Sequence, residues 1–337
     1  MSVALYRNFY GKSRIPTNPT QTIAYNNANL QYLGRWQDTG SGMWTGWSSP
    51  MVVFSVSGTN WIQINTTAID PSVTAIAALL FDVDNVAAAG AYVYVSSPLY
   101  ITGAAGINKS AMIMLPDTGT HNITLHTVGY NADVFNELSK LTILSYNIPA
   151  TATISTWTQG AKIIQCVGDS WMGAGNDWPR LMSTANYKLY PIGAGGLQCS
   201  QMDTQYNFNY AGNAANTDST ADAVIVSFGV NDFNASVTTA TFETAMFALY
   251  DKIRAKQATA KIFLIRVPKN IAASKDYGQY GPNMATVVAA RTNCFYVDTT
   301  SLDATIEWAD GDVNHLSANG KQTLADFVKA ALVAQGV

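Results

Sequence analysis

The chain has 337 residues, of which 48% are hydrophobic and only 12% are Asp, Glu, Lys or Arg. Globular proteins usually carry about 25% charged residues, so Asn, Thr, Ser and Gln must supply much of the polar surface. The net charge of −3 gives no electrostatic argument for nucleic acid or a membrane as a partner, since either would require a basic patch. Because domains usually run to about 100–200 residues, the length predicts two domains.

Residues 1–150 show the pattern of a β-rich domain. Apolar and polar residues alternate over 50–69, around a Gly-Thr-Asn turn, and again over 89–101, 121–130 and 138–148. Such alternation is typical of strands with one buried face. Short strands between Gly, Ser, Asn and Pro turns predict a β-sandwich of the jelly-roll kind as an accessory domain.

Residues 151–160 are rich in Thr, Ser and Ala and show neither strand alternation nor helix caps, so we predict a linker there.

Residues 161–337 show a different pattern of apolar and polar residues. Five apolar runs are typical of strands buried on both faces: 161–169, 187–194, 222–230, 260–268 and 294–298. Amphipathic stretches at 239–257 and 317–335 have helical spacing. This alternation predicts a parallel sheet covered by helices on both faces, with function at the carboxyl ends of its strands.

Three strand ends or loops in this second half carry polar motifs. Gly-Asp-Ser ends the first run at 168–170, Gly-Val-Asn-Asp follows another at 229–232, and Asp312 stands three residues before His315. Each motif alone is more often a turn or a helix cap. All three in this order are hard to explain as turns.

Acyl transfer by a serine needs the residue types that these motifs supply. A hydroxyl becomes a good nucleophile only when a neighbouring base takes its proton, and neutral histidine suits that task near pH 7. A carboxylate must orient the imidazole, and hydrogen-bond donors must meet the oxyanion. His315 is the only histidine in this half of the chain, so it is the only candidate base for Ser170 within the same domain.

The set of motifs resembles that of the SGNH (GDSL-type) hydrolases over residues 160–337. "VGDSW" matches the family's first block, "GAGG" at 193–196 its glycine block, "GVND" its third block and "DVNH" its last. The resemblance implies a three-layer, flavodoxin-like α/β fold. It also implies that Ser170 is the nucleophile, His315 the base and Asp312 its orienting acid. The oxyanion hole would consist of the backbone N–H groups of Ser170 and Gly196 and the side-chain amide of Asn231.

Two features of this chain depart from the family's pattern. Trp171 follows the nucleophile, where a small aliphatic residue is common, and Asp310 lies near Asp312. Some relatives use a backbone carbonyl in place of the aspartate. Gly-x-Ser-x-Gly, the signature of another class of serine hydrolases, is absent because position 172 is Met.

The first half resembles, over residues 30–58, the jelly-roll domain that precedes the SGNH domain in some carbohydrate acetylesterases. Exposed aromatics suit the faces of sugars, so Trp171 and Trp308 are candidates for substrate binding, and Arg266 for contact with an acidic sugar. The alternatives are that the tryptophans belong to the core and that the arginine is an ordinary surface residue.

Three functions remain open. The first is a serine esterase that removes small acyl groups, O-acetyl first among them, from a carbohydrate. The second is a lipase, lysophospholipase or thioesterase. The third is a non-catalytic carbohydrate-binding or virion-attachment protein. A serine hydrolase needs no metal and no cofactor, and we infer none.

The compartment and the oligomeric state also remain open. Cys166, Cys199 and Cys294 are too far apart for a CxxC motif, and we interpret them as buried thiols. No secretory signal or membrane span is expected from the sequence. Cytoplasmic residence, export by another route and assembly into a larger particle are all compatible with this, and the sparse charge slightly favours an extracellular or virion-associated protein.

Overall fold

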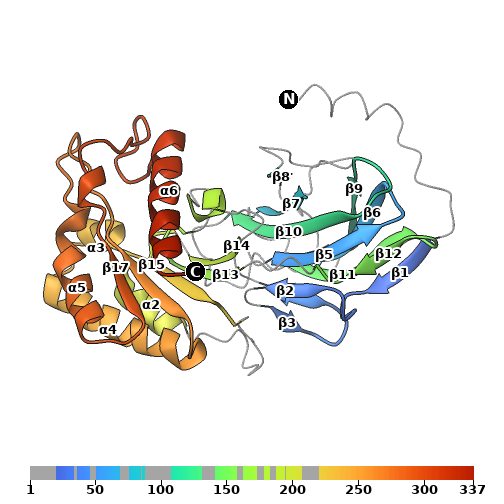
Figure 1. Ribbon diagram of the computed structural model, residues 1–337, viewed down its shortest axis with the longest axis horizontal. Helices are drawn as coiled ribbons and strands as arrows, with labels where there is room; N and C mark the ends of the chain where they lie inside the picture. Colours follow the sequence, from blue (N-terminus) through green and yellow to red (C-terminus); the bar gives the residue numbers. More distant parts are fainter. Residues whose placement is uncertain are drawn as a thin grey trace.

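The computed structural model of the protein describes residues 20–33, 36–45, 51–68, 76–84, 86–87, 108–130, 141–157, 162–172, 178–182, 187–193, 195–206 and 220–337. A β-rich N-terminal part and a C-terminal part with helices around a sheet lie side by side (Figure 1). In the described residues, none of the helices has the length and apolar character of a membrane span.

The N-terminal part consists of two antiparallel sheets of six strands each within the described residues. The first sheet contains β1 (Thr20–Ala24), β3 (Gln37–Asp38), β4 (Met43–Thr45), β6 (Trp61–Ala68), β9 (Asn108–Met114) and β11 (Leu141–Pro149). The second contains β2 (Gln31–Leu33), β5 (Met51–Ser57), β7 (Ile76–Val83), β8 (Val86–Ala87), β10 (His121–Tyr130) and β12 (Thr153–Ser155). One buried cluster joins the sheets, with the rings of Phe54 (β5) and Tyr146 (β11) 5.4 Å apart. The predicted sandwich is thus confirmed.

The sequence-based strands are confirmed wherever the structure describes them. The alternation over 50–69 corresponds to β5 and β6, which belong to different sheets, and the later two alternating stretches correspond to β10 and β11. The predicted strand over 89–101 lies outside the described residues.

Part of the predicted linker over 151–160 is a strand. Thr153–Ser155 forms β12 and pairs with β5, with Ile154 buried between two exposed neighbours. Three residues are too few for alternation to be recognised in the sequence. The domain boundary itself stays a prediction.

The C-terminal part contains a parallel five-stranded sheet, as predicted. Its strands are β13 (Lys162–Gly168), β14 (Tyr187–Gly193), β15 (Ala223–Ser227), β16 (Lys261–Ile265) and β17 (Cys294–Val297). They lie in the order β14-β13-β15-β16-β17, the flavodoxin-like order, with the topological switch point between β13 and β15. Ligands in such sheets bind outside the carboxyl ends of the strands at that point.

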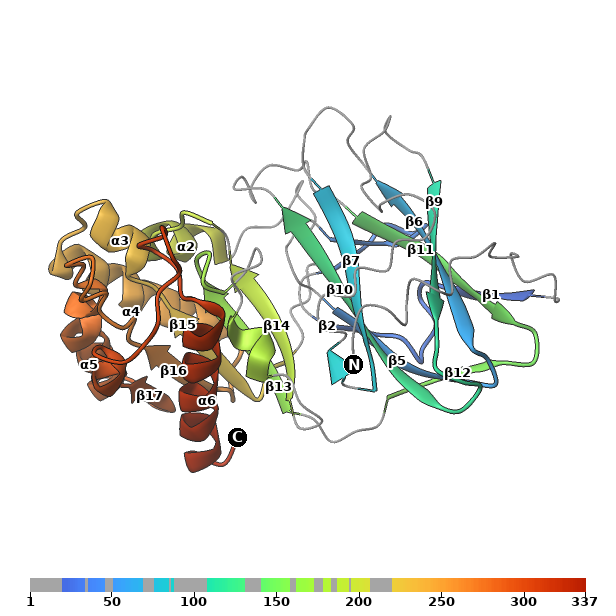
Figure 2. The same ribbon diagram turned by 90° about the horizontal axis from the view of Figure 1, so that it is seen from above.

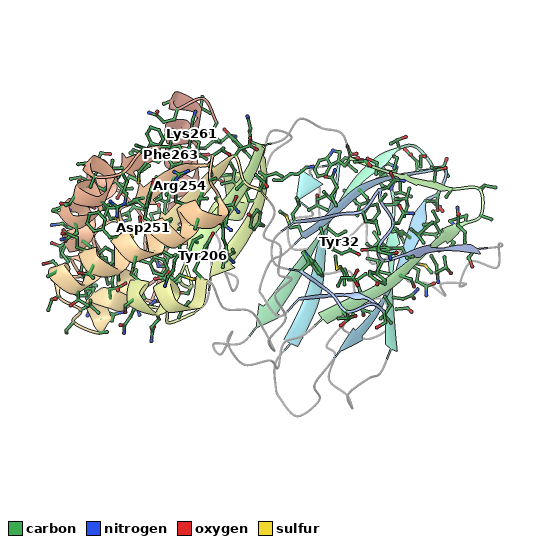
Figure 3. The ribbon with its side chains drawn as sticks, turned by 90° about the horizontal axis from the view of Figure 1, so that it is seen from below. Tyr32, Tyr206, Asp251, Arg254, Lys261 and Phe263 are labelled. Atoms are coloured by element: carbon green, nitrogen blue, oxygen red, sulfur yellow. The ribbon has the colours of Figure 1, made fainter. Side chains whose placement is uncertain are left out.

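Helices cover both faces of this sheet, which makes three layers (Figure 2). The helical elements are η3 (Trp178–Met182), α2 (Cys199–Tyr206), α3 (Val230–Asn234), α4 (Thr239–Lys256), η5 (Tyr277–Tyr280), α5 (Gly281–Ala289), η6 (Thr300–Leu302) and α6 (Ala318–Ala334). Alternate residues of β15 face opposite layers, since Val224 packs in the cluster of α2, α4 and α5, and Ile225 in that of η3 and α6. Figure 3 shows Tyr206 of α2 and Arg254 of α4 in the first of these layers.

The two parts share a buried core. Met51 and Trp157 of the N-terminal part belong to the same cluster as Tyr190 of β14. The Lys188 ammonium lies 4.4 Å from the centre of the Trp157 ring and 3.4 Å from the side-chain oxygen of Gln31. The sandwich therefore packs beside β14, the strand at that edge of the parallel sheet.

Candidate active site

The turn after β13 places Ser170 at the switch point. A Cβ at Gly168 would lie 2.4 Å from Met172 Cγ and 2.6 Å from the Ser227 carbonyl, and one at Gly193 would lie 2.8 Å from the Asp169 carbonyl. Only glycine permits such close approach of the strand ends. The loop that carries Ser170 is therefore held tightly between β14 and β15.

The structure brings together the three predicted catalytic residues. Ser170 Oγ lies 2.9 Å from His315 Nε2, and His315 Nδ1 lies 2.6 Å from Asp312 Oδ2. Partial burial of Asp312 acts against ionisation, but the hydrogen bonds from His315 and from the Asn314 backbone N–H lower its pKa overall. A carboxylate that stays ionised can hold one imidazole tautomer and stabilise the imidazolium. The arrangement has the geometry that an activated serine requires, and the catalytic roles stay predictions.

The predicted oxyanion donors follow strands β13, β14 and β15. Gly196 is exposed and has a φ of 78°. Apart from its chain neighbours, no atom of the described residues lies within 4 Å of the place a Cβ would take. Asn231 donates from its side-chain nitrogen to Asp169 Oδ2 and to the Leu197 carbonyl, both at 3.1 Å. That nitrogen carries two hydrogens, so donation to an oxyanion requires one of these contacts to open. The roles of Ser170, Gly196 and Asn231 in an oxyanion hole stay predictions.

Two carboxyl groups are buried behind the nucleophile. Asp169 accepts hydrogen bonds from the Trp171 backbone N–H and the Asn231 amide, and Asp232 accepts one from the Cys199 backbone N–H at 3.0 Å. Burial, reinforced by the nearby Asp232, raises the pKa of Asp169 to about 7, and burial raises the pKa of Asp232 to about 6. These groups link the nucleophile turn to α2 and α3.

Two predicted substrate-binding residues need correction. Trp171 is only 2% exposed, and its indole N–H donates to the Asn314 carbonyl at 2.8 Å, so it is a core residue that contacts the His315 loop. Arg266 is 5% exposed and makes two hydrogen bonds of 2.8 Å to the carboxylate of Asp303. Its charge is neutralised inside the protein. Trp308 is partly exposed and packs edge-on against Trp171, so its contact with substrate stays a prediction.

Sequence reasoning missed the residues that hold the loop over 309–316. Asn314 stands inside the "DVNH" motif, but the prediction of the site uses only the three-residue spacing between Asp312 and His315 in that motif. Tyr277 and Asn270 contact the same loop from the segment after β16, 36 and 43 residues before Val313 in the chain. No pattern in the sequence points to them, because their partners are distant in the chain.

The fold and the site define an α/β acylhydrolase domain of the SGNH type, preceded by a β-sandwich. Residues 158–323 match the GDSL-like Lipase/Acylhydrolase family, and this half of the chain is a domain of that family, the class of ester hydrolases. No sequence among the curated proteins matches the chain.

Solved structures share the whole two-domain fold. A family two carbohydrate esterase from Cellvibrio japonicus has a TM-score of 0.70 at 14% identity, over 94% of this chain and 98% of that one. An acetyl xylan esterase from Butyrivibrio proteoclasticus has a TM-score of 0.67 at 14% identity, with the same coverage. A family two carbohydrate esterase from Clostridium thermocellum in complex with cellohexaose has a TM-score of 0.66 at 16% identity, over 91% and 98%. At these identities the likeness establishes the fold.

Proposed function

We propose that the protein is a serine esterase that removes small acyl groups, O-acetyl first among them, from a carbohydrate. The observation that carries the proposal is the hydrogen-bonded chain Ser170–His315–Asp312, with distances of 2.9 and 2.6 Å. The structural neighbours that are carbohydrate esterases support the substrate class.

In the proposed reaction, Ser170 Oγ forms a bond to the acyl carbon while its proton passes to His315 Nε2. The ester C–O bond then breaks, and His315 returns the proton to the leaving sugar hydroxyl. Water next loses a proton to His315 and attacks the acyl carbon. The bond between that carbon and Ser170 Oγ then breaks, and His315 returns the proton to Oγ, which releases the carboxylic acid and restores Ser170. Asp312 stays ionised and stabilises the imidazolium in both halves.

The test compares hydrolysis of p-nitrophenyl acetate with that of butyrate and octanoate esters, using native protein, Ser170→Ala and, as a matched control, the exposed Ser301→Ala. We expect acetate turnover that falls as the acyl chain lengthens and that Ser170→Ala reduces by at least ~10³-fold, as triad removal does in serine hydrolases. Ser301→Ala should match the native protein. Acetate release from acetylated xylan and acetylated mannan then tests the carbohydrate.

Two results would contradict the proposal. Turnover that rises with chain length would favour a lipase or thioesterase. Turnover that survives Ser170→Ala, or none in the native protein, would favour the non-catalytic carbohydrate-binding protein.

A further inference from the structure

The loop that carries Asp312 and His315 has one residue whose polar groups nearly all bind other parts of the site. The Asn314 backbone N–H donates to Asp312 Oδ1 at 2.9 Å, and its carbonyl accepts from the Trp171 indole at 2.8 Å. Its side-chain Oδ1 accepts from the Tyr277 hydroxyl at 2.8 Å and from the Asn234 amide at 3.1 Å. Asn314 thus joins the acid of the triad to the residue after the nucleophile, to η5 and to α3.

The same loop has different support on its two sides. After His315, the N-cap of α6 anchors the chain, since Ser317 Oγ accepts from the Gly320 backbone N–H. Before His315, the segment has neither helix nor strand and lies partly exposed. Its backbone is closed by a hydrogen bond of 3.0 Å from the Ala309 N–H to the His315 carbonyl. Side chains also hold it at the Val313 carbonyl, which accepts from the Asn270 amide and the Tyr277 hydroxyl, each at 3.0 Å.

We propose that Asn314, held by Tyr277, is a positioning residue that keeps the Asp312–His315 pair against Ser170. The inference rests on the proposed function for its effect on turnover, but not for its effect on the geometry of the pair. Asn314 touches no reacting atom. It acts by fixing the backbone between the acid and the base, where a displacement of about 1 Å can cost up to ~10²-fold in rate.

Tyr277 is a suitable anchor because it is buried and its ring packs against two other aromatic rings. The residue is 1% exposed, and the centre of its ring lies 5.3 Å from that of Phe233 and 5.6 Å from that of Trp308. Tyr277→Phe removes the hydroxyl and keeps this packing. Tyr280 offers a matched control on the same short helix, since it is also 1% exposed and its hydroxyl donates to the Val237 carbonyl, away from the His315 loop.

The first measurement is kinetic and uses p-nitrophenyl acetate. We expect Asn314→Ala to lower kcat by about 10–100-fold with KM nearly unchanged. Tyr277→Phe should lower kcat by about 2–10-fold, the range for one neutral hydrogen bond, because the single hydroxyl proton is shared between Asn314 Oδ1 and the Val313 carbonyl. The double variant should lose less kcat than the product of the two single losses, because both substitutions remove the hydrogen bond between Tyr277 and Asn314. Tyr280→Phe should keep native kcat.

The second measurement does not depend on turnover. In protein labelled with ¹⁵N-histidine, the His315 Nδ1–H signal reports the hydrogen bond to Asp312, and the chain has only three histidines. We expect this signal to broaden by solvent exchange in Asn314→Ala and to persist in Tyr280→Phe. His121, whose Nδ1 lies 2.7 Å from Asp84 in the other domain, is the reference within the same spectrum.

The outcomes separate the two proposals. Asn314→Ala with an unchanged His315 signal, or Tyr280→Phe with the same kinetic loss as Tyr277→Phe, would overturn the positioning role. If the native protein lacks Ser170-dependent turnover, the proposed function fails, and the His315 signal in Asn314→Ala still decides whether Asn314 positions the pair. If Asn314→Ala does not fold, Tyr277→Phe provides both readouts.

Discussion

Asp169 and Asp232 are single residues behind the candidate nucleophile whose carboxyl groups have raised pKa values. Both carboxyl groups are buried, and water cannot solvate their charge. The backbone and amide donors that reach them favour the ionised form, but burial outweighs these donors and raises the pKa of both groups. The folded protein therefore binds protons more tightly at these sites than the unfolded chain does.

This difference predicts how stability depends on pH. Because the pKa of Asp232 is raised to about 6, the folded state holds more protons than the unfolded state from about pH 4 to 6, so the free energy of unfolding falls as pH rises through that window. Asp232→Asn should have a flatter profile there, whatever its absolute stability. Urea unfolding of both proteins at pH 4, 5, 6 and 7 measures the slopes. Parallel profiles would contradict the assignment.

At the scale of elements, His121 connects three parts of the sandwich. It begins β10, its Nδ1 lies 2.7 Å from Asp84 in the turn after β7, and its Nε2 lies 3.0 Å from Asp117 in the segment after β9. Burial alone would lower its pKa, but the hydrogen bonds to the two carboxylates raise it above the usual 6.5. The protonated imidazole thus holds the ends of the two sheets together.

Neutralisation of this histidine should loosen the sandwich. A group whose pKa is raised in the folded state contributes its full stability below the unfolded pKa, about 6.5, and loses it as pH rises through the folded value. The thermal midpoint of the native protein should therefore fall from pH 6 to 8 more steeply than that of His121→Gln. Differential scanning calorimetry across this range measures both slopes. If the two proteins lose stability in parallel, the His121 contacts contribute nothing measurable.

At the scale of the whole molecule, the shared core makes the two halves of the chain interdependent. Trp157 follows β12 of the sandwich and packs with Tyr190 and Lys188 of β14. Lys188 lies near the amino end of β14, whereas Ser170 lies beyond the carboxyl end of the neighbouring strand. Among the described residues, the contact between Trp157 and Lys188 and the candidate site thus lie at different ends of the sheet.

Trp157→Ala should separate stability from activity. Removing a buried tryptophan side chain costs about 3–5 kcal/mol, so we expect a clear fall in the midpoint of urea unfolding. Turnover of p-nitrophenyl acetate by the folded variant should stay within about 2-fold of native. An unchanged midpoint would show that the interface contributes little to stability. A large loss of kcat would show that a change at the interface alters the candidate active site.

Local patterns in this sequence predict the fold and the candidate site, whereas contacts between residues remote in the chain do not show in it. The strands came from local alternation, and Ser170, Asp312 and His315 from short motifs whose chemistry limits the choice of residue. The burial of Arg266 and Trp171 cannot be predicted from local patterns, because their partners, Asp303 and Asn314, are remote in the chain and are paired only by the fold. The contact between Asn314 and Tyr277 cannot be predicted from local patterns for the same reason.

The position of the sandwich beside β14 also bears on aggregation. An edge strand has unpaired backbone groups on one side, and these can recruit a strand from another molecule. The sandwich lies next to this edge (Figure 2), and Pro191 within β14 lacks an N–H to offer. The sandwich and Pro191 therefore both act against strand addition at β14. The hydrolase half produced alone would expose the apolar surface that now packs against Met51 and Trp157, and we expect it to self-associate through that surface.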